Sequence, residues 1–486
     1  MGRNYFKRGI SYFRRNGLAA SFVKAYERLA EDAAERGYEP QHADEAEAAS
    51  QRRHVFEHPY KFSILVPVYE TAPSLLMQMM QSVGGQTYGN WELILADASK
   101  DASRQEIADE FVRMYSDRCT DVFGSAEDKV KYVKIGENLG IGANTKEALS
   151  CATGDYIALL DHDDVLENTA LFDIMSAIDA GERELAAAGR DGDVLAVYTD
   201  EDKMNSDGSR YFDCHKKPGP DPVLLTTNNY VCHFFAAKAG LVRKAGAFDS
   251  IYDGAQDHDL ILRCFEQADR EQIIHVPKVL YHWRSTASST AENPEAKLYA
   301  YEAGKRAVAG HFKRLGLDVK IKDSAHLGFF IPDYPESGEK PARITPDELK
   351  KLSESGGALP GSRYVMILSP DLEPADAACI DDMMSCMCLE NVGAVTGKIL
   401  TRTGRVESAG FDRDENGDLI PRFAGLWRYF SGYMHRADLD RLTDAFSPDC
   451  VLVRCDAVKT LSPQLTLVDG ADIYYRAGAV FKRKSR

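Results

Sequence analysis

The chain has 486 residues, of which 44% are hydrophobic and 28% are charged, which is enough apolar material for two or three packed domains. Its formal net charge of −16 argues against a general nucleic-acid binder, because such a protein needs a basic surface. The ten cysteines include no Cys-x-x-Cys pair, and we find neither a run long enough to span a membrane nor a signal-peptide core. These features predict a reduced, cytoplasmic protein without a zinc site.

Residues 1–30 differ from the rest of the chain because basic side chains alternate with aromatic ones. Apolar residues recur there at helical spacing: Phe6, Ile10, Phe13, Leu18, Phe22 and Tyr26. A basic helix with an aromatic face can lie on an anionic membrane, so we expect peripheral contact with the inner face of the plasma membrane. The alternative is a helix packed on the main domain with its basic side in water.

From residue 62 onward, short apolar runs alternate with amphipathic segments. The spacing predicts strands at residues 62–68, 91–96, 130–135 and 156–160, separated by helices. Pro73 suits the first turn of the first of these helices. Alternating strands and helices predict an α/β fold with a doubly wound, mostly parallel sheet, whose ligand-bearing loops follow the carboxyl ends of the strands.

Acidic residues stand at two of those strand ends. Asp97 follows the second strand, and the run Asp161-His162-Asp163-Asp164 follows the fourth. Carboxylates two residues apart at a strand end can bind one hard divalent cation, so we predict Mg²⁺ or Mn²⁺ at Asp161 and Asp163. The alternative is a solvated acidic turn or a helix cap.

Two further acidic clusters and one histidine follow later in the chain. Thr199-Asp200-Glu201-Asp202 is the first cluster, and Gln256-Asp257-His258-Asp259 opens an amphipathic helix. The helix dipole alone favours carboxylates in a first turn, which is a structural alternative for Asp257 and Asp259. His282 follows a strand predicted at residues 273–280, and it is either a ligand or a core or capping histidine.

The order of these motifs between residues 60 and 316 resembles glycosyltransferase family 2, whose members have the GT-A fold. Ser63-Ile-Leu-Val-Pro67-Val68-Tyr69-Glu70 is similar to the opening strand and its turn, Asn138-Leu-Gly140-Ile-Gly142-Ala143-Asn144 to the Asn/Gly loop, and Asp161-His162-Asp163 to the DxD motif. Two positions depart from the family pattern, since Ala98 and Gln256 stand where acidic residues are common. The stretch 300–315 resembles a subgroup that builds bacterial surface polysaccharides, including rhamnan-type chains.

The resemblance implies a role for each matching residue. The general base is Asp257, with Asp259 as its rival. The metal ligands are Asp161, Asp163 and His282, and either His282 or Arg284 closes over the metal or the leaving diphosphate. The implied donor-binding residues are Pro67, Tyr69, Glu70, Asp97, Asn138, Asn144, Asp161, Asp200 and Arg284.

The implied reaction is inverting transfer of a sugar from a UDP- or dTDP-sugar to a growing surface polysaccharide or lipid-linked glycan. One alternative is a non-catalytic nucleotide-sugar-binding or scaffold protein of the polysaccharide assembly machinery. A nucleotidyltransferase is disfavoured, because a glycine-rich basic loop is missing after the first strand.

The chain also contains a degenerate internal repeat. We predict a helix and linker at residues 1–57, a GT-A catalytic domain at 58–320, a linker at 321–360 and a truncated glycosyltransferase-like domain at 361–486. Residues 364–371 match 156–163, and residues 469–476 are matched with 256–263. In this alignment Ser369 replaces Asp161 and Gly470 falls at the position of the base, so we expect no transfer activity from the copy.

Overall fold

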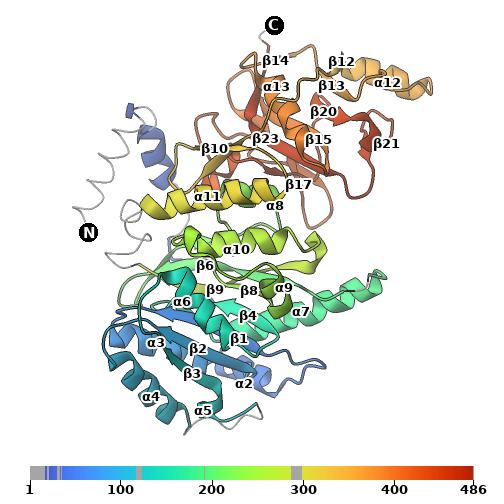
Figure 1. Cartoon of the computed structure of the whole chain (residues 1–486). Helices are drawn as coiled ribbons and strands as arrows, with labels where there is room; N and C mark the ends of the chain where they lie inside the picture. The colour runs from blue at the N-terminus through green and yellow to red at the C-terminus, as the bar shows by residue number, and fades with distance from the viewer. Residues whose placement is uncertain are drawn as a thin grey trace. The chain divides into compact units, whose positions relative to one another are not determined.

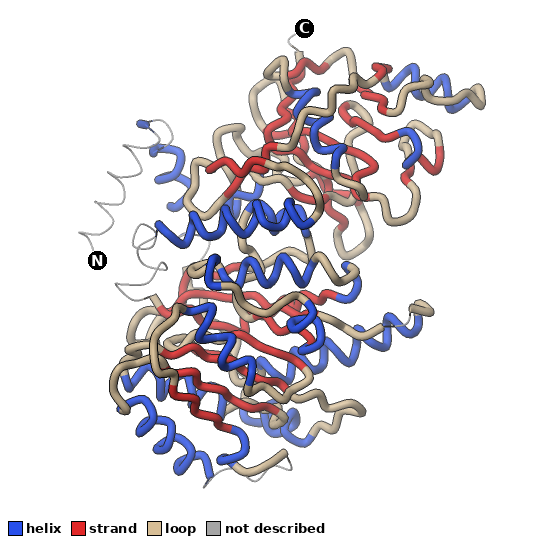
Figure 2. The backbone as a smooth tube through the Cα atoms, in the orientation of Figure 1, coloured by secondary structure: helices blue, strands red, loops and turns tan. Residues whose placement is uncertain are grey.

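The computed structural model describes residues 17–18, 21–29, 33, 36–116, 123–190, 192–285 and 298–484. The chain divides into two compact units (Figure 1). We call residues 35–220 and 229–315 the first unit, and residues 1–34, 221–228 and 316–486 the second unit. Strands form the centre of each unit (Figure 2).

The first unit is built on one mixed sheet. Across the sheet the strands are β3 (Val130–Lys134), β2 (Trp91–Asp97), β1 (Phe62–Val68), β4 (Tyr156–Leu159), β8 (Phe235–Lys238), β6 (Ala196–Met204), β9 (Ile273–Arg284) and β5 (Val165–Leu166), with β7 (Tyr211–His215) beside β6. The first four are mutually parallel, β8 is antiparallel to both of its neighbours, and β6 and β9 are parallel. The predicted α/β class with a mostly parallel sheet is confirmed.

The helices follow the strands as the apolar pattern predicts. They are α2 (Glu45–Arg53), α3 (Pro73–Gly84), α4 (Ser103–Ser116), α5 (Ala126–Lys129), α6 (Ile141–Ser150), α7 (Ala170–Ala187), α9 (Ala239–Lys244), α10 (Gln256–Phe265) and α11 (Leu298–Arg314). All seven residues of β2 are buried, as expected of a parallel strand covered on both faces. Pro73 occupies the first turn of α3, where its missing N–H costs nothing.

The second unit contains a sheet with the same topology as part of the first. Its strands are β12 (Ala342–Ile344), β13 (Tyr364–Leu368), β20 (Cys450–Arg454), β15 (Val392–Leu400), β23 (Asp472–Arg483) and β14 (Leu372–Pro374), with β16 (Val406–Ser408) beside β15. Taken in this order, neighbouring strands pair parallel or antiparallel in the same sequence as β1, β4, β8, β6, β9 and β5 of the first unit. The antiparallel pair of β16 with β15 likewise repeats that of β7 with β6. The unit also has β10 (Lys320–Asp323), β11 (Phe330–Asp333), β17 (Phe411–Arg413), β18 (Leu419–Pro421), β19 (Arg441–Leu442), β21 (Val458–Thr460), β22 (Thr466–Leu467), α8 (Pro222–Thr227), α12 (Pro346–Glu354) and α13 (Cys379–Ser385).

This topology corrects one part of the predicted repeat and agrees with another. Residues 472–483 form the strand β23, parallel to β15, so they correspond to β9 and not to the helix at 256–263. The pairing of Tyr364 with Arg454 repeats that of Tyr156 with Lys238, which agrees with the predicted match of 364–371 to 156–163. Between β20 and β23 the copy has the hairpin β21–β22 where the first unit has α9 and α10.

The segment 321–360, predicted as a linker, is also structured. It contains β10, β11, β12 and α12, and β12 pairs with β13 as β1 pairs with β4. A capping box starts α12, since Thr345 and Glu348 exchange side-chain and backbone hydrogen bonds. The copy therefore keeps a short strand–helix pair, β12 and α12, before β13, which corresponds to β4 of the first unit.

Residues 21–29 are helical, as the apolar spacing before residue 30 predicts. The expected positions Phe6, Ile10 and Phe13 lie outside the described residues. None of the described helices combines the length and the apolar character needed to cross a bilayer.

Candidate functional site

The turns after β1 and β2 are tied to each other. Pro67 lies opposite Ala96 in the sheet, and Tyr69 beyond it is 43% exposed. The Glu70 N–H donates to Ser99 Oγ at 2.8 Å, with Glu70 in the left-handed region at φ 49°. The side chains of Tyr69 and Glu70 therefore reach solvent at the carboxyl edge of the sheet, where the family resemblance implies donor contacts.

Asp97 ends β2 and is completely buried. Its carboxylate accepts hydrogen bonds from the Ser99 N–H at 2.8 Å, from Lys134 Nζ at 3.1 Å and from the Tyr132 hydroxyl. Burial raises the pKa of Asp97, but these hydrogen bonds outweigh burial and hold its pKa below the usual value. Asp97 is therefore an anion fixed in place beside the predicted base-binding turn.

Asn138 and Asn144 lie at the start of α6. Asn138 Oδ1 accepts from the Gly140 N–H at 3.1 Å and from Asn144 Nδ2 at 3.0 Å. Gly140 has φ 99°, a conformation that side chains rarely adopt, and the N–H of Gly142 donates to Asp253 Oδ1 at 2.9 Å. The Oδ1 atom of Asn144 is buried and accepts no hydrogen bond from the described residues, so it remains available to a donor group on a ligand.

The acidic motif after β4 is held by β9. Asp164 is 1% exposed, and its carboxylate accepts from the Arg284 N–H at 2.7 Å and from the Tyr281 hydroxyl. Burial and the charges of Asp163 and Asp161 raise the pKa of Asp164 well above its usual value. Burial also raises the pKa of Asp163, and Asp161 adds to this effect against an opposing contribution from His162. Three carboxylates packed in this way favour a bound cation.

The atoms that could ligate a metal include His233, which the sequence did not indicate. One ligand atom each from Asp161, Asp164 and His233 lie within 4.8 Å of one another. Asp163 is outside this group and its carboxylate lies 3.6 Å from His162 Nδ1, with the side chain 25% exposed. The structure thus adds Asp164 and His233 beside Asp161 as candidate ligands, and the predicted role of Asp163 stays a prediction.

His282, a predicted metal ligand, is not among the residues of this group. Its Nδ1 lies 2.7 Å from Asp202 and its Nε2 lies 3.5 Å from Glu167, and the ring is buried. Burial lowers the pKa of His282, but the hydrogen bonds to Asp202 and Glu167 outweigh it and raise the pKa to about 9. His282 lies in a buried network with Asp202 and Glu167, and its predicted role as a metal ligand stays a prediction.

Arg284 and Asp200 are also engaged by the protein itself. The Arg284 guanidinium is 1% exposed and donates from Nε to the Asp163 carbonyl at 2.7 Å. Asp200 is buried, with Oδ1 2.7 Å from His275 Nε2 and 2.8 Å from the Lys217 N–H. In this geometry Arg284 positions the acidic motif, and Asp200 positions the strand β6.

Asp257 lies in the first turn of α10 and faces the segment before β8. Its Oδ2 accepts from Asn229 Nδ2 at 2.8 Å and from the Cys232 thiol at 3.8 Å. Burial raises the pKa of Cys232 well above its usual value, and the charges of Glu201 and Asp257 add to this, so the thiol is neutral and can donate. Asp259 instead binds Arg263 through Nε at 2.9 Å and Nη2 at 2.6 Å, a structural pairing within α10.

A second group of potential metal ligands lies between Asp257, the predicted base, and the acidic motif at Asp161. Ligand atoms of Glu201, Cys232 and His233 lie within 4.8 Å of one another, and His233 is shared with the Asp161 group. Glu201 is a buried carboxylate, and although burial raises its pKa, Lys217 and His215 bring the pKa to about 2. The residues missed by sequence reasoning, Cys232 and His233, therefore connect Asp161 with Asp257.

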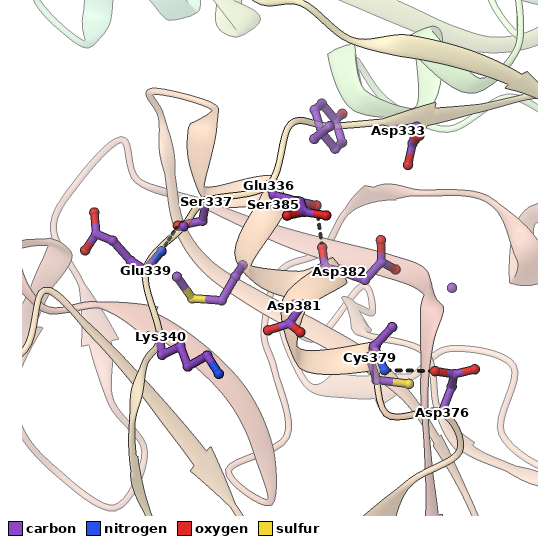
Figure 3. A pocket seen from close by; sticks show the side chains of 15 residues that line it. Asp333, Glu336, Ser337, Glu339, Lys340, Asp376, Cys379, Asp381, Asp382 and Ser385 are labelled. Atoms are coloured by element: carbon purple, nitrogen blue, oxygen red, sulfur yellow. Dashed lines mark hydrogen bonds between the residues drawn. The ribbon is translucent and has the colours of Figure 1, made fainter.

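The second unit has a cavity of different character. Its volume is about 580 Å³, and its lining includes Glu336, Asp381 and Asp382 (Figure 3). Acidic walls disfavour a diphosphate donor. Among the described residues, both groups of clustered metal-ligating atoms lie in the first unit and neither lies in this cavity.

The strand ends of the first unit thus bring together carboxylates, a histidine and a separate helix-borne aspartate, as in an enzyme that handles a metal-bound anion. Residues 63–245 match the family model described as Glycosyl transferase family 2. Residues 63–245 therefore resemble a glycosyltransferase family 2 domain. This match agrees with the predicted GT-A fold of the first unit.

The curated relatives include proteins of polysaccharide biosynthesis. The O-antigen biosynthesis protein RfbC of Myxococcus xanthus is 26% identical over 436 residues, covering 76% of this chain and 32% of the relative. An uncharacterised protein of Sinorhizobium fredii is 40% identical over 252 residues, covering 52% of this chain and 25% of the relative. The chain thus spans about a quarter to a third of the length of these two relatives.

Solved structures give a weaker similarity. S. aureus TarS 1-349 in complex with UDP-GlcNAc has a TM-score of 0.36 at 16% identity, covering 52% of this chain and 72% of that chain. The mannosyltransferase PcManGT from Pyrobaculum calidifontis, in complex with GDP-Man and Mn²⁺, has a TM-score of 0.35 at 17% identity, covering 61% of this chain and 74% of that chain.

Proposed function

We propose that the first unit is an inverting, metal-dependent glycosyltransferase that uses a UDP- or dTDP-sugar. The acceptor is a growing surface polysaccharide or a lipid-linked glycan on the cytoplasmic face of the plasma membrane. One observation carries the proposal: the motif at Asp161 and the aspartate at Asp257 converge on adjacent residues, Cys232 and His233. A donor can then lie between a metal–diphosphate site and a base.

The residues at the motif fit a hard divalent cation. Oxygen ligands from Asp161 and Asp164, with the imidazole of His233, are a suitable donor set for Mg²⁺ or Mn²⁺. Asp163 stays a predicted ligand from the motif spacing. The cation, when bound, offsets the negative charge of the diphosphate leaving group.

The chain's own residues provide the remaining steps. Asp257 accepts the proton of the acceptor hydroxyl as its oxygen forms a bond to the anomeric carbon. The bond from that carbon to the diphosphate oxygen breaks on the opposite face, which inverts the configuration. Asn229 and Cys232 hold one oxygen of Asp257 by hydrogen bonds, and among the described residues none bonds to its other oxygen, which faces the acceptor in this proposal.

The test is a panel of nucleotide sugars assayed for donor turnover with Mg²⁺ or Mn²⁺. We expect turnover of a uridine- or thymidine-diphosphate sugar, its loss in excess chelator, and its loss in Asp161→Ala. Asp371→Ala, at the position of the copy that matches Asp163, is the control. Full activity of Asp161→Ala in chelator would contradict the metal assignment.

The competing function is binding without turnover, as in a scaffold of the assembly machinery. It predicts metal-dependent donor binding with neither hydrolysis nor transfer. The buried acceptor Asn144 Oδ1 fits both functions, but a scaffold gives no reason for a positioned carboxylate at Asp257. If Asp257→Asn binds the donor as the unchanged protein does but loses turnover, the protein is an enzyme and not a scaffold.

A further inference from the structure

The helical residues 21–29 are attached to the second unit by their polar side. Glu27 accepts from the Ser431 N–H at 2.6 Å, and Lys24 Nζ lies 3.2 Å from His435 Nε2. Tyr26 stacks on Phe430 with ring centroids 5.3 Å apart. The helix is thus fastened to the loop of residues 426–436.

The attachment leaves the apolar side of the helix facing solvent. Leu18 is 76% exposed, Phe22 is 75% exposed and Leu29 is 68% exposed. The spacing of Phe22 and Leu29 within residues 21–29 places both on one face, opposite Glu27. A helix of a globular protein normally buries its apolar face and exposes its polar face, and here the arrangement is reversed. None of the other described residues buries this apolar face, so it is open to an outside partner.

The loop to which the helix is fastened adds aromatic side chains and cations. Trp427 is 41% exposed, Tyr429 63% and Tyr433 41%. An arginine stacks on each ring, with distances to the ring centroid of 4.3 Å for Arg405 on Trp427, 4.6 Å for Arg428 on Tyr429 and 5.2 Å for Arg436 on Tyr433. Such a basic aromatic loop stands out on a chain of net charge −16.

We propose that the helical residues 21–29 and the loop 426–436 form a single docking surface for an anionic lipid bilayer. The occupant is a lipid surface because the exposed groups are those that partition to the membrane interface: aliphatic side chains and amphipathic aromatic rings, with arginines for the lipid phosphates. The degenerate second unit then serves to present the helix and to add its own lipid contacts. The inference deepens the proposed function by specifying how the enzyme reaches a membrane-bound acceptor, and it rests on that function for the acceptor alone.

The experiment is vesicle flotation of the full chain at low and high salt. The vesicles contain phosphatidylcholine alone or with phosphatidylglycerol. We expect flotation only with phosphatidylglycerol and its loss at high salt. The double variant Phe22→Ser with Leu29→Ser removes the apolar face. The loop variant, Arg405→Gln with Arg428→Gln, removes one cation of the loop and the cation that stacks on Trp427 of the loop. We expect the loop variant to bind about 30-fold more weakly, because each surface cation is worth about a five-fold change.

Matched controls come from exposed residues elsewhere. Leu315→Ser changes a leucine that is 50% exposed in the first unit, and Lys350→Glu changes an exposed cation on α12. Both controls should float as the unchanged protein does. Circular dichroism and donor hydrolysis in solution verify that each variant is folded, and they report on the proposed function separately from membrane binding.

Four outcomes would overturn the proposal. One is the absence of flotation with anionic vesicles at low salt, and another is equal flotation with neutral vesicles. A third is unchanged binding of the loop variant, which would restrict any lipid contact to the helix. The last is self-association that Phe22→Ser with Leu29→Ser abolishes in the absence of vesicle binding, since the cover would then be a second copy of the chain.

Discussion

Replacing Arg284 with lysine distinguishes two roles for this arginine. The family resemblance implies contact with the donor diphosphate, whereas the geometry has the guanidinium buried beneath the acidic motif. It donates to the Asp163 carbonyl at 2.7 Å, to the Ser206 carbonyl at 3.0 Å and to Gln78 Oε1 at 2.8 Å. A lysine retains the charge but cannot make three hydrogen bonds in this fixed arrangement.

The size of the effect follows from the lost hydrogen bonds. If the ammonium keeps the contact with Asp163, the bonds to Ser206 and Gln78 are lost, and a hydrogen bond to a charged group is worth about 1.5–3 kcal/mol. Ser206 is exposed, so water can replace its partner. We therefore expect Arg284→Lys to lose about 2–3 kcal/mol of stability, which lowers the Tm by roughly 5–10 °C in a unit of this size.

The assay combines thermal unfolding with metal titration of donor turnover. Because Arg284 holds the backbone of the acidic motif, Arg284→Lys should need a higher Mn²⁺ concentration for half-maximal turnover, with little change in donor KM at saturating metal. Arg476→Lys is the control: its guanidinium is 4% exposed and binds Asp382 and Asp440 in the second unit. It should lose stability and keep its metal dependence. An unchanged metal requirement with a raised donor KM in Arg284→Lys would refute the positioning role.

Three other predictions test the remaining assignments. Asp257→Asn should keep donor binding and lose about 10²–10⁴ in turnover, as expected for a positioned base, whereas Asp259→Asn should lose less turnover; equal losses would contradict the assignment. Asp371→Ala should leave turnover unchanged, and a loss would move the active site to the copy. Burial and the Lys24 charge lower the pKa of His326 to about 4 and that of His435 to about 2, so both rings are neutral in the fold. The contribution of the neutral rings is complete above the unfolded pKa of about 6.5 and is lost as the pH falls toward 4. The protection factors of the amides of residues 21–29, which correct for the intrinsic pH dependence of hydrogen exchange, should therefore be lower at pH 5 than at pH 7.5.

The sequence predicts the first half of the sheet well because each parallel strand is a continuous apolar run. Residues 62–68 and 91–97 are buried along nearly their whole length, so apolar side chains are required at consecutive positions. Asp97 and Asp161, at the ends of the second and fourth runs, mark the ligand edge. Local sequence patterns are therefore enough to predict the strands and the site residues where neighbouring strands are parallel and the ligand-binding residues follow them in the chain.

The same reasoning fails for His233, and the cause is strand direction. β8 runs antiparallel to β4, so the residues before β8 lie at the same edge of the sheet as the residues after β4. A search of the carboxyl ends of strands cannot find a residue at an amino end. The signal available was the pair Cys232-His233, two potential ligands directly before an apolar run, but its significance depends on topology that a single sequence does not give.

The misaligned end of the repeat has a different cause. Asp472 and Arg476 have the same spacing as Asp259 and Arg263, and in α10 this spacing makes an ion pair on one helix face. In β23 the same spacing places both residues on one face of a strand, since side chains alternate with period two. Spacing of four residues fits both structures, so the pair could not distinguish a helix from a strand. The residue types of the segment do distinguish them, because the β-branched and aromatic residues Ile473, Tyr474 and Tyr475 favour a strand. The copy therefore lacks the helix that would hold a base, and its inactivity is predicted by a missing element as well as by the substitution at Ser369.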